Sequence, residues 1–230
     1  MIGQDILFFN SLDSTNEYVK NHLDKLEPGT IVTAKRQIAG KGRRGKEWIS
    51  NEGNLFFSLL LERDYDCNFS YVMRASTVLV QALAEFGLEA KIKYPNDIMV
   101  RGRKIAGILI EAKKGFMIIG IGLNVREEQF ETLEAKATSI KFETGYNFDP
   151  LDILYAFVKN CNDIMHKEEE HLYQQYIAHS YVIGKEIKFQ GHKATITKIT
   201  RKGLLQISFD DTFRLVSMDD ITLEELYYDK

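Results

Sequence analysis

The sequence is short of cysteine and of long apolar runs, and each shortage excludes a kind of protein. Cys67 and Cys161 are its two cysteines, too few for a disulfide framework, so we expect a cytoplasmic location where thiols stay reduced. No apolar run approaches the roughly 20 residues of a membrane-spanning helix, so no membrane association is expected. The first residues are neither basic nor followed by an apolar run of signal-peptide length.

The chain also lacks an excess of basic residues. Its 30 Lys and Arg against 33 Asp and Glu give a net charge of −3, whereas a domain that binds nucleic acid is usually basic. With 44% hydrophobic and 27% charged residues, the composition is that of a globular protein. A length of 230 residues suits one domain of ordinary size, alone or with a small second one.

Against this mildly acidic background, one stretch concentrates glycine and positive charge. Residues 40–48 read GKGRRGKEW, so three glycines are interleaved with four cations and the only tryptophan follows. Glycine lets a ligand approach the backbone closely, and exposed N–H groups with Lys and Arg suit an anion that has several oxygens. Because the Trp48 indole is suited to stack on a flat ring, the stretch predicts a nucleotide site. The alternative is a solvated basic surface loop.

Two phosphate-binding motifs match this stretch by letters alone. The G-x-G-x-x-G fingerprint needs a helix that opens within the loop, but residues 48–54 are typical of a turn before a strand. The P-loop needs Ser or Thr at the position of Glu47. We therefore reject both motifs.

Hydrophobic periodicity predicts an α+β domain followed by a small β-rich one. We expect strands at residues 6–9, 31–34, 55–61, 91–94, 98–100, 105–112 and 116–125. Helical spacing predicts helices at 70–86, with Ser70 as N-cap, and from 150 to about 179. Short β runs at 187–189, 194–199, 204–209 and 213–216 indicate a small antiparallel barrel, so we place the domains at 1–182 and 183–230.

A third helix is predicted to begin after residue 13. Ser14 and Glu17 have the spacing of a capping box, and apolar residues recur at helical spacing until Pro28 ends the element. Ser14, Thr15 and Asn16 therefore lie at a helix N-terminus. Three consecutive hydrogen-bonding side chains exceed what one cap requires, so a polar ligand group could use the surplus.

The segment from residue 91 to residue 125 is predicted to hold further polar groups on a β-sheet. Asn96, Asp97 and Lys104 fall on opposite sides of one hairpin, although a lysine at a strand end can simply be solvated. The strand glycines at 107, 120 and 122 are costly unless something must approach closely.

Other charged segments do not indicate a site. Residues 127–136 are predicted to form a mobile loop or loose helix, and the acidic residues 168–170 a solvated helix face. His166 and His171 lack the spacing of a metal site.

Four strings in fixed order carry a resemblance to a known family: residues 13–16, residue 37 with 39–48, residues 93–97 with 103–107, and residues 120–124. This ordered set closely resembles the biotin–protein ligases, which attach biotin to a lysine of carboxylase carrier domains. The resemblance runs from about residue 6 to the end of the chain. It implies a mixed β-sheet with packed helices, like that of class II synthetases, and an SH3-like C-terminal barrel.

The resemblance implies a role for each string. Biotin would contact residues of the first two strings and of the glycine-containing strands: Ser14, Thr15, Asn16, Gln37, Lys41, Gly42, Arg43, Lys104, Gly107, Gly120 and Gly122. ATP and the adenylate would contact a second, mostly polar set: Arg43, Arg44, Lys46, Trp48, Asn96, Lys104 and Asn124. The catalytic residues would be Lys104, Arg43 and Asp97, with Asp97 as the one candidate to assist Mg²⁺.

The chemistry implied is a two-step ligation in which ATP activates biotin to biotinyl-adenylate before the acceptor lysine attacks. The implied partner is a biotin carboxyl carrier protein or a carboxylase biotinyl domain, and two copies of the chain could pair through exposed strands. Because the catalytic pattern starts within the first residues, we expect the form without an N-terminal DNA-binding domain and no specific DNA binding.

Three residues depart from the pattern of the family, and two rival interpretations of the sequence stay open. Lys41 and Lys46 stand where many relatives have Arg, which replaces a planar two-pronged contact by a point charge, and Tyr94 replaces a common Trp. The nearest rival is a lipoate-type or other acyl ligase of the same fold. The other is a nucleic-acid-binding module that uses the basic loop.

Overall fold

The computed structural model describes residues 1–63, 68–128, 137–164, 167–209 and 212–217. Seven strands make up a large sheet: β1 Ile6–Leu12, β2 Ile31–Gln37, β3 Leu55–Glu62, β4 Ala90–Lys93, β5 Asp97–Val100, β6 Arg103–Lys113 and β7 Phe116–Leu123. The helices are α1 Thr15–Asn21, η1 Arg43–Gly45, α2 Asn68–Ala84, α3 Ile140–Thr144, α4 Pro150–Ile164 and α5 Glu169–Ala178. Four strands follow in a second sheet: β8 Glu186–Phe189, β9 His192–Ile199, β10 Leu205–Phe209 and β11 Thr212–Val216.

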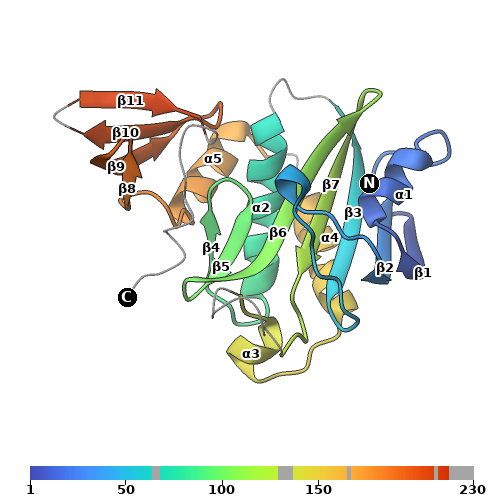
Figure 1. Ribbon diagram of the computed structural model, residues 1–230. Helices are drawn as coiled ribbons and strands as arrows, with labels where there is room; N and C mark the ends of the chain where they lie inside the picture. Colours follow the sequence, from blue (N-terminus) through green and yellow to red (C-terminus); the bar gives the residue numbers. More distant parts are fainter. Residues whose placement is uncertain (64–67, 129–136, 165–166, 210–211, 218–230) are drawn as a thin grey trace.

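The two sheets confirm the predicted α+β class with a β-rich C-terminal part (Figure 1). The large sheet has the order β1-β2-β3-β7-β6-β5-β4, in which β1 and β2 are parallel and the other neighbours antiparallel. The second sheet is antiparallel with the order β11-β10-β9-β8. Among the described helices, none is both long and apolar enough to cross a membrane.

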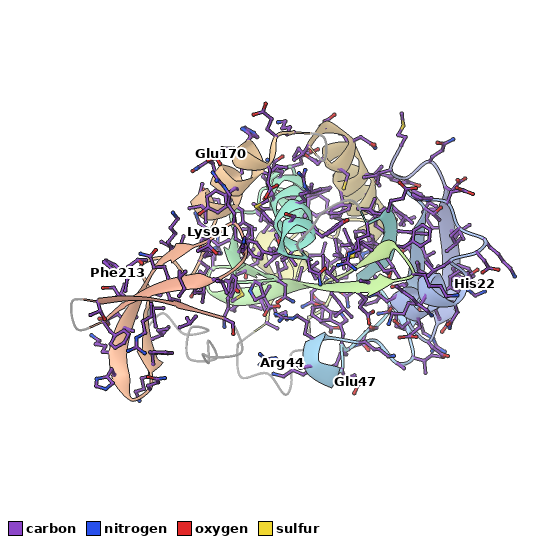
Figure 2. The ribbon with its side chains drawn as sticks, turned by 90° about the horizontal axis from the view of Figure 1, so that it is seen from above. His22, Arg44, Glu47, Lys91, Glu170 and Phe213 are labelled. Atoms are coloured by element: carbon purple, nitrogen blue, oxygen red, sulfur yellow. The ribbon has the colours of Figure 1, made fainter. Side chains whose placement is uncertain are left out.

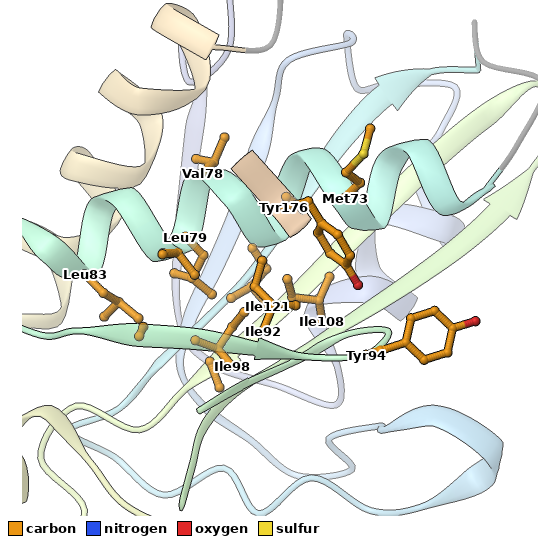
Figure 3. Close-up of a cluster of buried hydrophobic side chains, with 14 of the residues drawn as sticks. Met73, Val78, Leu79, Leu83, Ile92, Tyr94, Ile98, Ile108, Ile121 and Tyr176 are labelled. Carbon is orange, nitrogen blue, oxygen red and sulfur yellow. The ribbon is translucent and has the colours of Figure 1, made fainter. Parts of the chain in front are cut away.

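The alternation of side chains along the strands assigns the helices to opposite faces of the large sheet. On one face, residues such as Leu59 and Ile119 join the main core beneath α2 and α4. Figure 3 shows α2 lying along this face, with Leu79 and Leu83 directed at the sheet. On the other face, Leu60 forms a smaller cluster with Val19 of α1 and its neighbours. Helix α1 therefore covers only part of the second face.

Helix α1 is shorter than predicted and begins differently. It ends at Asn21, where the ring of the next residue, His22, stacks on Tyr18 at 4.1 Å and its Nδ1 lies 2.8 Å from the Tyr18 carbonyl oxygen. The later leucines that suggested a longer helix pack onto the same cluster from a turn. The capping box is wrong, because within the described residues the Ser14 side chain makes no capping hydrogen bond.

Two further helix predictions are corrected. The helix expected from residue 150 to about 179 is two helices, α4 and α5, and between them the Lys167 N–H donates to the Ile164 carbonyl at 2.9 Å. Helix α2 begins at Asn68, so Ser70 lies inside it and is not its N-cap. Cys67, His166 and most of the segment 127–136 lie outside the described residues.

The four predicted β runs after residue 186 are confirmed as β8 to β11. This sheet packs tightly against the first part of the chain. The Tyr94 hydroxyl donates to the Gly203 carbonyl at 2.5 Å, and the Tyr173 hydroxyl donates to the Ile199 carbonyl at 2.6 Å. One apolar cluster runs through both sheets, so the boundary at residue 182 stays a prediction.

Candidate functional site

A cavity of about 360 Å³ lies on the second face of the large sheet, beside α1. Its wall comes from the start of α1, the glycine-rich segment 40–48, the turn between β4 and β5, and the middle of β6 and β7. This volume is that of a small-molecule site. Every residue predicted for the site lines this cavity except Asn124.

The glycine-rich segment folds back on itself as a short hairpin. The Trp48 N–H donates to the Gly40 carbonyl at 2.9 Å, and the Gly42 N–H donates to the Lys46 carbonyl at 2.7 Å. At its tip the three-residue turn η1 places Arg44 at φ 55°. Figure 2 shows Arg44 and Glu47 at this tip, on the side of the sheet away from α2. No helix of nucleotide-binding length opens in these described residues, in agreement with the rejection of both stock motifs.

Arg43 reaches from this hairpin to the opposite wall of the cavity. Its Nη1 donates to Asn96 Oδ1 at 2.8 Å, and Asn96 Nδ2 in turn donates to the Ile108 carbonyl at 2.7 Å. The Asn96 amide is therefore fixed by the sheet and presents its oxygen to the loop. The loop lies closed over the cavity in this structure.

Lys104 and Asp97 face each other across the β5–β6 hairpin, as the sequence predicted. Lys104 Nζ lies 2.7 Å from Asp97 Oδ1 and 5.1 Å from the centre of the Trp48 ring. All three side chains line the cavity. An ammonium group in this position can contact a ligand anion while the carboxylate keeps it in place.

The polar start of α1 forms the other end of the cavity. Thr15 donates to Gln37 Oε1 from its backbone N–H at 2.8 Å and from its hydroxyl at 3.2 Å. Gln37 Nε2 donates to Ser50 Oγ at 3.0 Å, so this glutamine is fixed at both ends of its amide. Thr15 and Asn16 are buried, which makes their side chains a preorganised set of hydrogen-bonding groups.

The strand glycines leave space above the sheet, and the side chains of Trp48 and Asn16 occupy the nearest part of that space. A Cβ at Gly122 would lie 2.5 Å from the Trp48 indole, and a Cβ at Gly120 would lie 2.3 Å from Asn16 Oδ1. A Cβ at Gly107 would lie 2.9 Å from the same indole. The indole thus rests flat on a glycine surface, and its buried Nε1 has no hydrogen-bond partner among the described residues.

Asn124 lies apart from the other predicted residues. Its side chain donates to the Thr138 carbonyl at 3.0 Å, and its backbone N–H donates to the Ile105 carbonyl at 2.9 Å. These contacts join the end of β7 to the segment before α3. In the described structure its amide serves the fold, so its predicted adenine contact stays a prediction.

Several residues at the site had no role in the sequence-based prediction. The buried cation Lys93 lines the cavity, as does Tyr94, and both belong to a string that had been recognised only as a motif. Ser58 and Glu111 hold Asn16 from behind. Their pairing spans 42 and 95 residues of sequence, so no local spacing could have revealed it.

The charge of the cavity is opposite to that of the whole chain. Six Lys or Arg and two Asp or Glu line it, whereas the chain carries a net charge of −3. Among the described residues no three His, Cys, Asp or Glu are grouped to hold a metal ion. The lining therefore favours a ligand with several negative oxygens at one end and hydrogen-bonding groups at the other.

The fold and this cavity define an α+β protein with a cation-lined cavity beneath a glycine-rich loop. Residues 8–125, just over half of the chain, match the Biotin/lipoate A/B protein ligase family, and the chain belongs to that family.

The curated relatives that the chain matches are longer than the match. The Bacillus subtilis (strain 168) protein named "Bifunctional ligase/repressor BirA" is 33% identical over an aligned length of 182 positions, which covers 72% of this chain and 56% of that protein. The Paracoccus denitrificans "Biotin--[acetyl-CoA-carboxylase] ligase" is 34% identical over an aligned length of 158 positions, which covers 62% of this chain and 65% of that protein. The chain spans about half the length of the first curated relatives.

A solved structure resembles the whole described fold. The "Biotin protein ligase from Aquifex aeolicus in complex with biotin and ATP" superimposes with a TM-score of 0.86 at 25% identity, covering 95% of this chain and 98% of that one. The similarity therefore includes the C-terminal sheet as well as the domain that carries the cavity.

Proposed function

We propose that this protein is an ATP-dependent, AMP-forming biotin–protein ligase. The observation that carries the proposal is one cavity in which a polar end, built by Thr15, Asn16 and Gln37, meets a cationic end beneath a closed loop. Biotin matches the polar end, because its ureido ring has two N–H donors and a carbonyl acceptor. The biotin carboxylate and the ATP phosphates match the cationic end. The similarity to proteins that are named as biotin ligases supports the same assignment.

In the first step, a biotin carboxylate oxygen attacks the α-phosphorus of ATP. The bond between the α-phosphorus and the bridging oxygen breaks, and pyrophosphate leaves. Two anions must meet in this step, so Lys104 and Arg43 act by lowering their repulsion and by holding the reacting atoms together. The ion pair of Lys104 with Asp97 fixes the ammonium group at the place where both anions would lie.

The site residues fit a magnesium ion that arrives with ATP. Mg²⁺ is usually bound by one or two carboxylates together with substrate phosphates, and the cavity offers Asp97 and Glu47. Asp97 is the residue that would hold it. When bound, the ion neutralises phosphate charge and lowers the barrier to pyrophosphate departure.

In the second step, the neutral amine of an acceptor lysine attacks the acyl carbon of biotinyl-adenylate. The bond to AMP breaks, and the amine loses a proton as the amide forms. This step needs no protein nucleophile. Cys161 is buried in the core, where burial raises the pKa of its thiol, so it cannot serve as one.

A biotin carboxyl carrier protein or carboxylase biotinyl domain is the proposed acceptor, and the cytoplasm is the proposed location, because ATP is abundant there. Pairing of two copies through exposed strands stays a prediction. The alternative of a nucleic-acid-binding module is disfavoured, because the basic residues of the loop line the cavity and Arg43 donates a hydrogen bond to Asn96 on its opposite wall.

Thermal denaturation with different ligands tests the proposal against its rivals. A ligand that binds the folded state raises the melting temperature by mass action. We expect biotin with ATP and Mg²⁺ to raise it by several degrees, and lipoate with ATP and Mg²⁺ or an oligonucleotide to have less effect. Lipoate would be a poor partner for Thr15 and Gln37, since its dithiolane ring has no hydrogen-bonding groups. A larger shift with lipoate, or with the oligonucleotide, would favour that rival.

A further inference from the structure

Behind the cavity, four side chains of alternating charge form a continuous chain of ion pairs. Glu111 Oε1 on β6 lies 2.5 Å from Lys20 Nζ on α1, and the same Nζ lies 2.9 Å from Glu17 Oε1. That Glu17 oxygen also lies 2.7 Å from Nζ of Lys41 in the glycine-rich loop. This series of ion pairs therefore runs from the sheet, across α1, to the loop that covers the cavity.

Both ends of this series of ion pairs reach the lining of the cavity. At the loop end, Lys41 is itself part of the lining. At the sheet end, Glu111 Oε2 accepts a hydrogen bond from Asn16 Nδ2 at 2.8 Å. Asn16 Oδ1 accepts from Ser58 Oγ at 2.5 Å, so the orientation of this buried amide is fixed from both sides.

Glu17 is the residue that links the loop lysine to the lysine of α1. A carboxylate in the first turn of a helix commonly completes a capping box, but the Glu17 carboxylate contacts Lys20 and Lys41 instead. Lys20 is mostly buried, at 16% exposure of its side chain, and Lys41 is 52% exposed. The partly buried pair of Lys20 and Glu111 thus holds Glu17 in position, and Glu17 holds the more exposed Lys41.

The glycine-rich loop depends on such polar contacts. Besides its own hairpin bonds, contacts that position the loop include Lys41 on Glu17, Arg43 on Asn96 and the Trp48 ring on the strand glycines. Residues 40–47 contain no apolar side chain, so within the segment Trp48 alone supplies an apolar contact. A single ion pair of ordinary strength can therefore change the ratio of open to closed loop several-fold.

We propose that Glu17 is a positioning residue that holds the glycine-rich loop closed through Lys41, and that Lys20 and Glu111 tie this contact to Asn16 in the wall of the cavity. The consequence for the reaction rests on the proposed function: closure of the loop is coupled to the ordering of the polar end of the cavity, where biotin would bind. Glu17 would then affect how long biotinyl-adenylate is held, with little effect on its chemistry.

The test uses Trp48 and the loop itself as reporters, in the full chain without ligand. Because Trp48 is the only tryptophan, acrylamide quenching of its fluorescence reports loop opening, and trypsin cleavage after the loop cations reports the same opening. Glu17→Gln is expected to increase both by about two- to five-fold, the effect of losing one ion pair. Glu85→Gln is the matched control: Glu85 also contacts a lysine, Lys159, but beside α4 and far from the loop.

A double-mutant design separates positioning from a general structural effect. In a Lys41→Met background, Glu17→Gln should add less than about 1.5-fold to quenching and cleavage, because its partner is gone. Equal effects of Glu17→Gln in both backgrounds would overturn the proposal, as would no effect in the wild-type background.

A kinetic arm tests the consequence for the reaction. Glu17→Gln should release preformed biotinyl-adenylate about two- to five-fold faster, with the rate of its formation at saturating substrates changed by less than that factor. Unchanged release, with adenylate formation intact, would refute the link to catalysis. If the wild type forms no biotinyl-adenylate, the proposed function fails, whereas the quenching and cleavage results still decide the role of Glu17.

Discussion

Lys104 and Asp97 face each other across the β5–β6 hairpin, with Nζ and Oδ1 2.7 Å apart. The bulge in this hairpin lies between Ile98 and Met99, so its two strands change register close to the pair. The pair is partly exposed, with side-chain exposures of 27% and 16%, and both members line the cavity. The Lys104 ammonium group can therefore contact a ligand in the cavity from the position in which Asp97 holds it.

The first prediction concerns this cation. Lys104→Ala should lower the rate of biotinyl-adenylate formation by on the order of 10²-fold, as expected for one well-placed electrostatic group. The folded state should be little affected, because the side chain is partly exposed. Lys91→Ala, which removes an exposed lysine of β4, is the control. A Lys104→Ala rate of pyrophosphate release close to that of the wild type would refute the assigned role.

The second prediction concerns Arg43 and the closed loop. Arg43→Gly removes the contact with Asn96 and with it one anchor of the loop. The variant should still form some biotinyl-adenylate but release it, and released adenylate should label lysines of an unrelated protein added to the reaction. Closure protects a hydrolysable mixed anhydride from water. Arg36→Ala, on the exposed part of β2, is the control. Wild-type retention of the adenylate by the variant would show that Arg43 is not the clamp.

The loop itself shows how far the sequence could predict the site. Its glycines and cations, read with the three other strings, predicted 16 of the 22 residues that line the cavity, because polar side chains at element ends and glycines inside strands stand out in the sequence. The position of the indole was not predictable: it depends on Gly107 and Gly122, which lie at least 59 residues further along the chain. The series of ion pairs through Glu17 and Glu111 was not predicted either, because it also joins residues that lie far apart in the sequence.

Local rules failed where tertiary contacts prevail. The spacing of Ser14 and Glu17 predicted a capping box, but Glu17 is drawn to Lys20 and Lys41. Strand positions were predicted well, since long apolar runs buried in a sheet leave few alternatives. The ends of helices were less predictable, because a turn can place leucines on the same apolar cluster as a helix does.

A third prediction tests the glycine surface beneath Trp48. Gly122→Ala would bring a Cβ to 2.5 Å from the indole, so the ring must move, at a cost of about 1–3 kcal/mol. The melting temperature should fall, the emission of Trp48 should shift, and biotin affinity should weaken. Gly107→Ala gives a closest contact of 2.9 Å with the same ring and should have a smaller effect. Unchanged emission in Gly122→Ala would contradict the packing.

A fourth prediction follows from the ionisation of Glu17. Hydrogen bonds from Lys41 and then Lys20 lower the pKa of this carboxyl from 4.5 to about 2 in the folded state. A lowered folded-state pKa means that the stabilisation is fully present above pH 4.5 and is lost as the pH falls towards 2. The free energy of unfolding of the wild type should therefore exceed that of Glu17→Gln by about 0.5–1 kcal/mol at neutral pH.

Urea denaturation at several pH values measures this difference. The gap between the two proteins should narrow as the pH is lowered from 4.5, because the Glu17 carboxyl of the unfolded wild type binds a proton that the folded state must release until the pH approaches 2. Glu85→Gln serves again as control for a paired carboxylate elsewhere. A gap that is the same at pH 7 and at pH 2.5 would show that the charge of Glu17 does not stabilise the fold.

Exchange of labelled pyrophosphate into ATP tests the central claim most directly, because it follows the activation step alone. With Mg²⁺ and ATP present, the protein should catalyse exchange when biotin is added and much less when lipoate replaces it. Mass spectrometry should identify biotinyl-adenylate, with AMP as the nucleotide released when a carrier domain is then supplied. Faster exchange with lipoate, formation of ADP, or no exchange with biotin would contradict the assignment of this cavity to biotin activation.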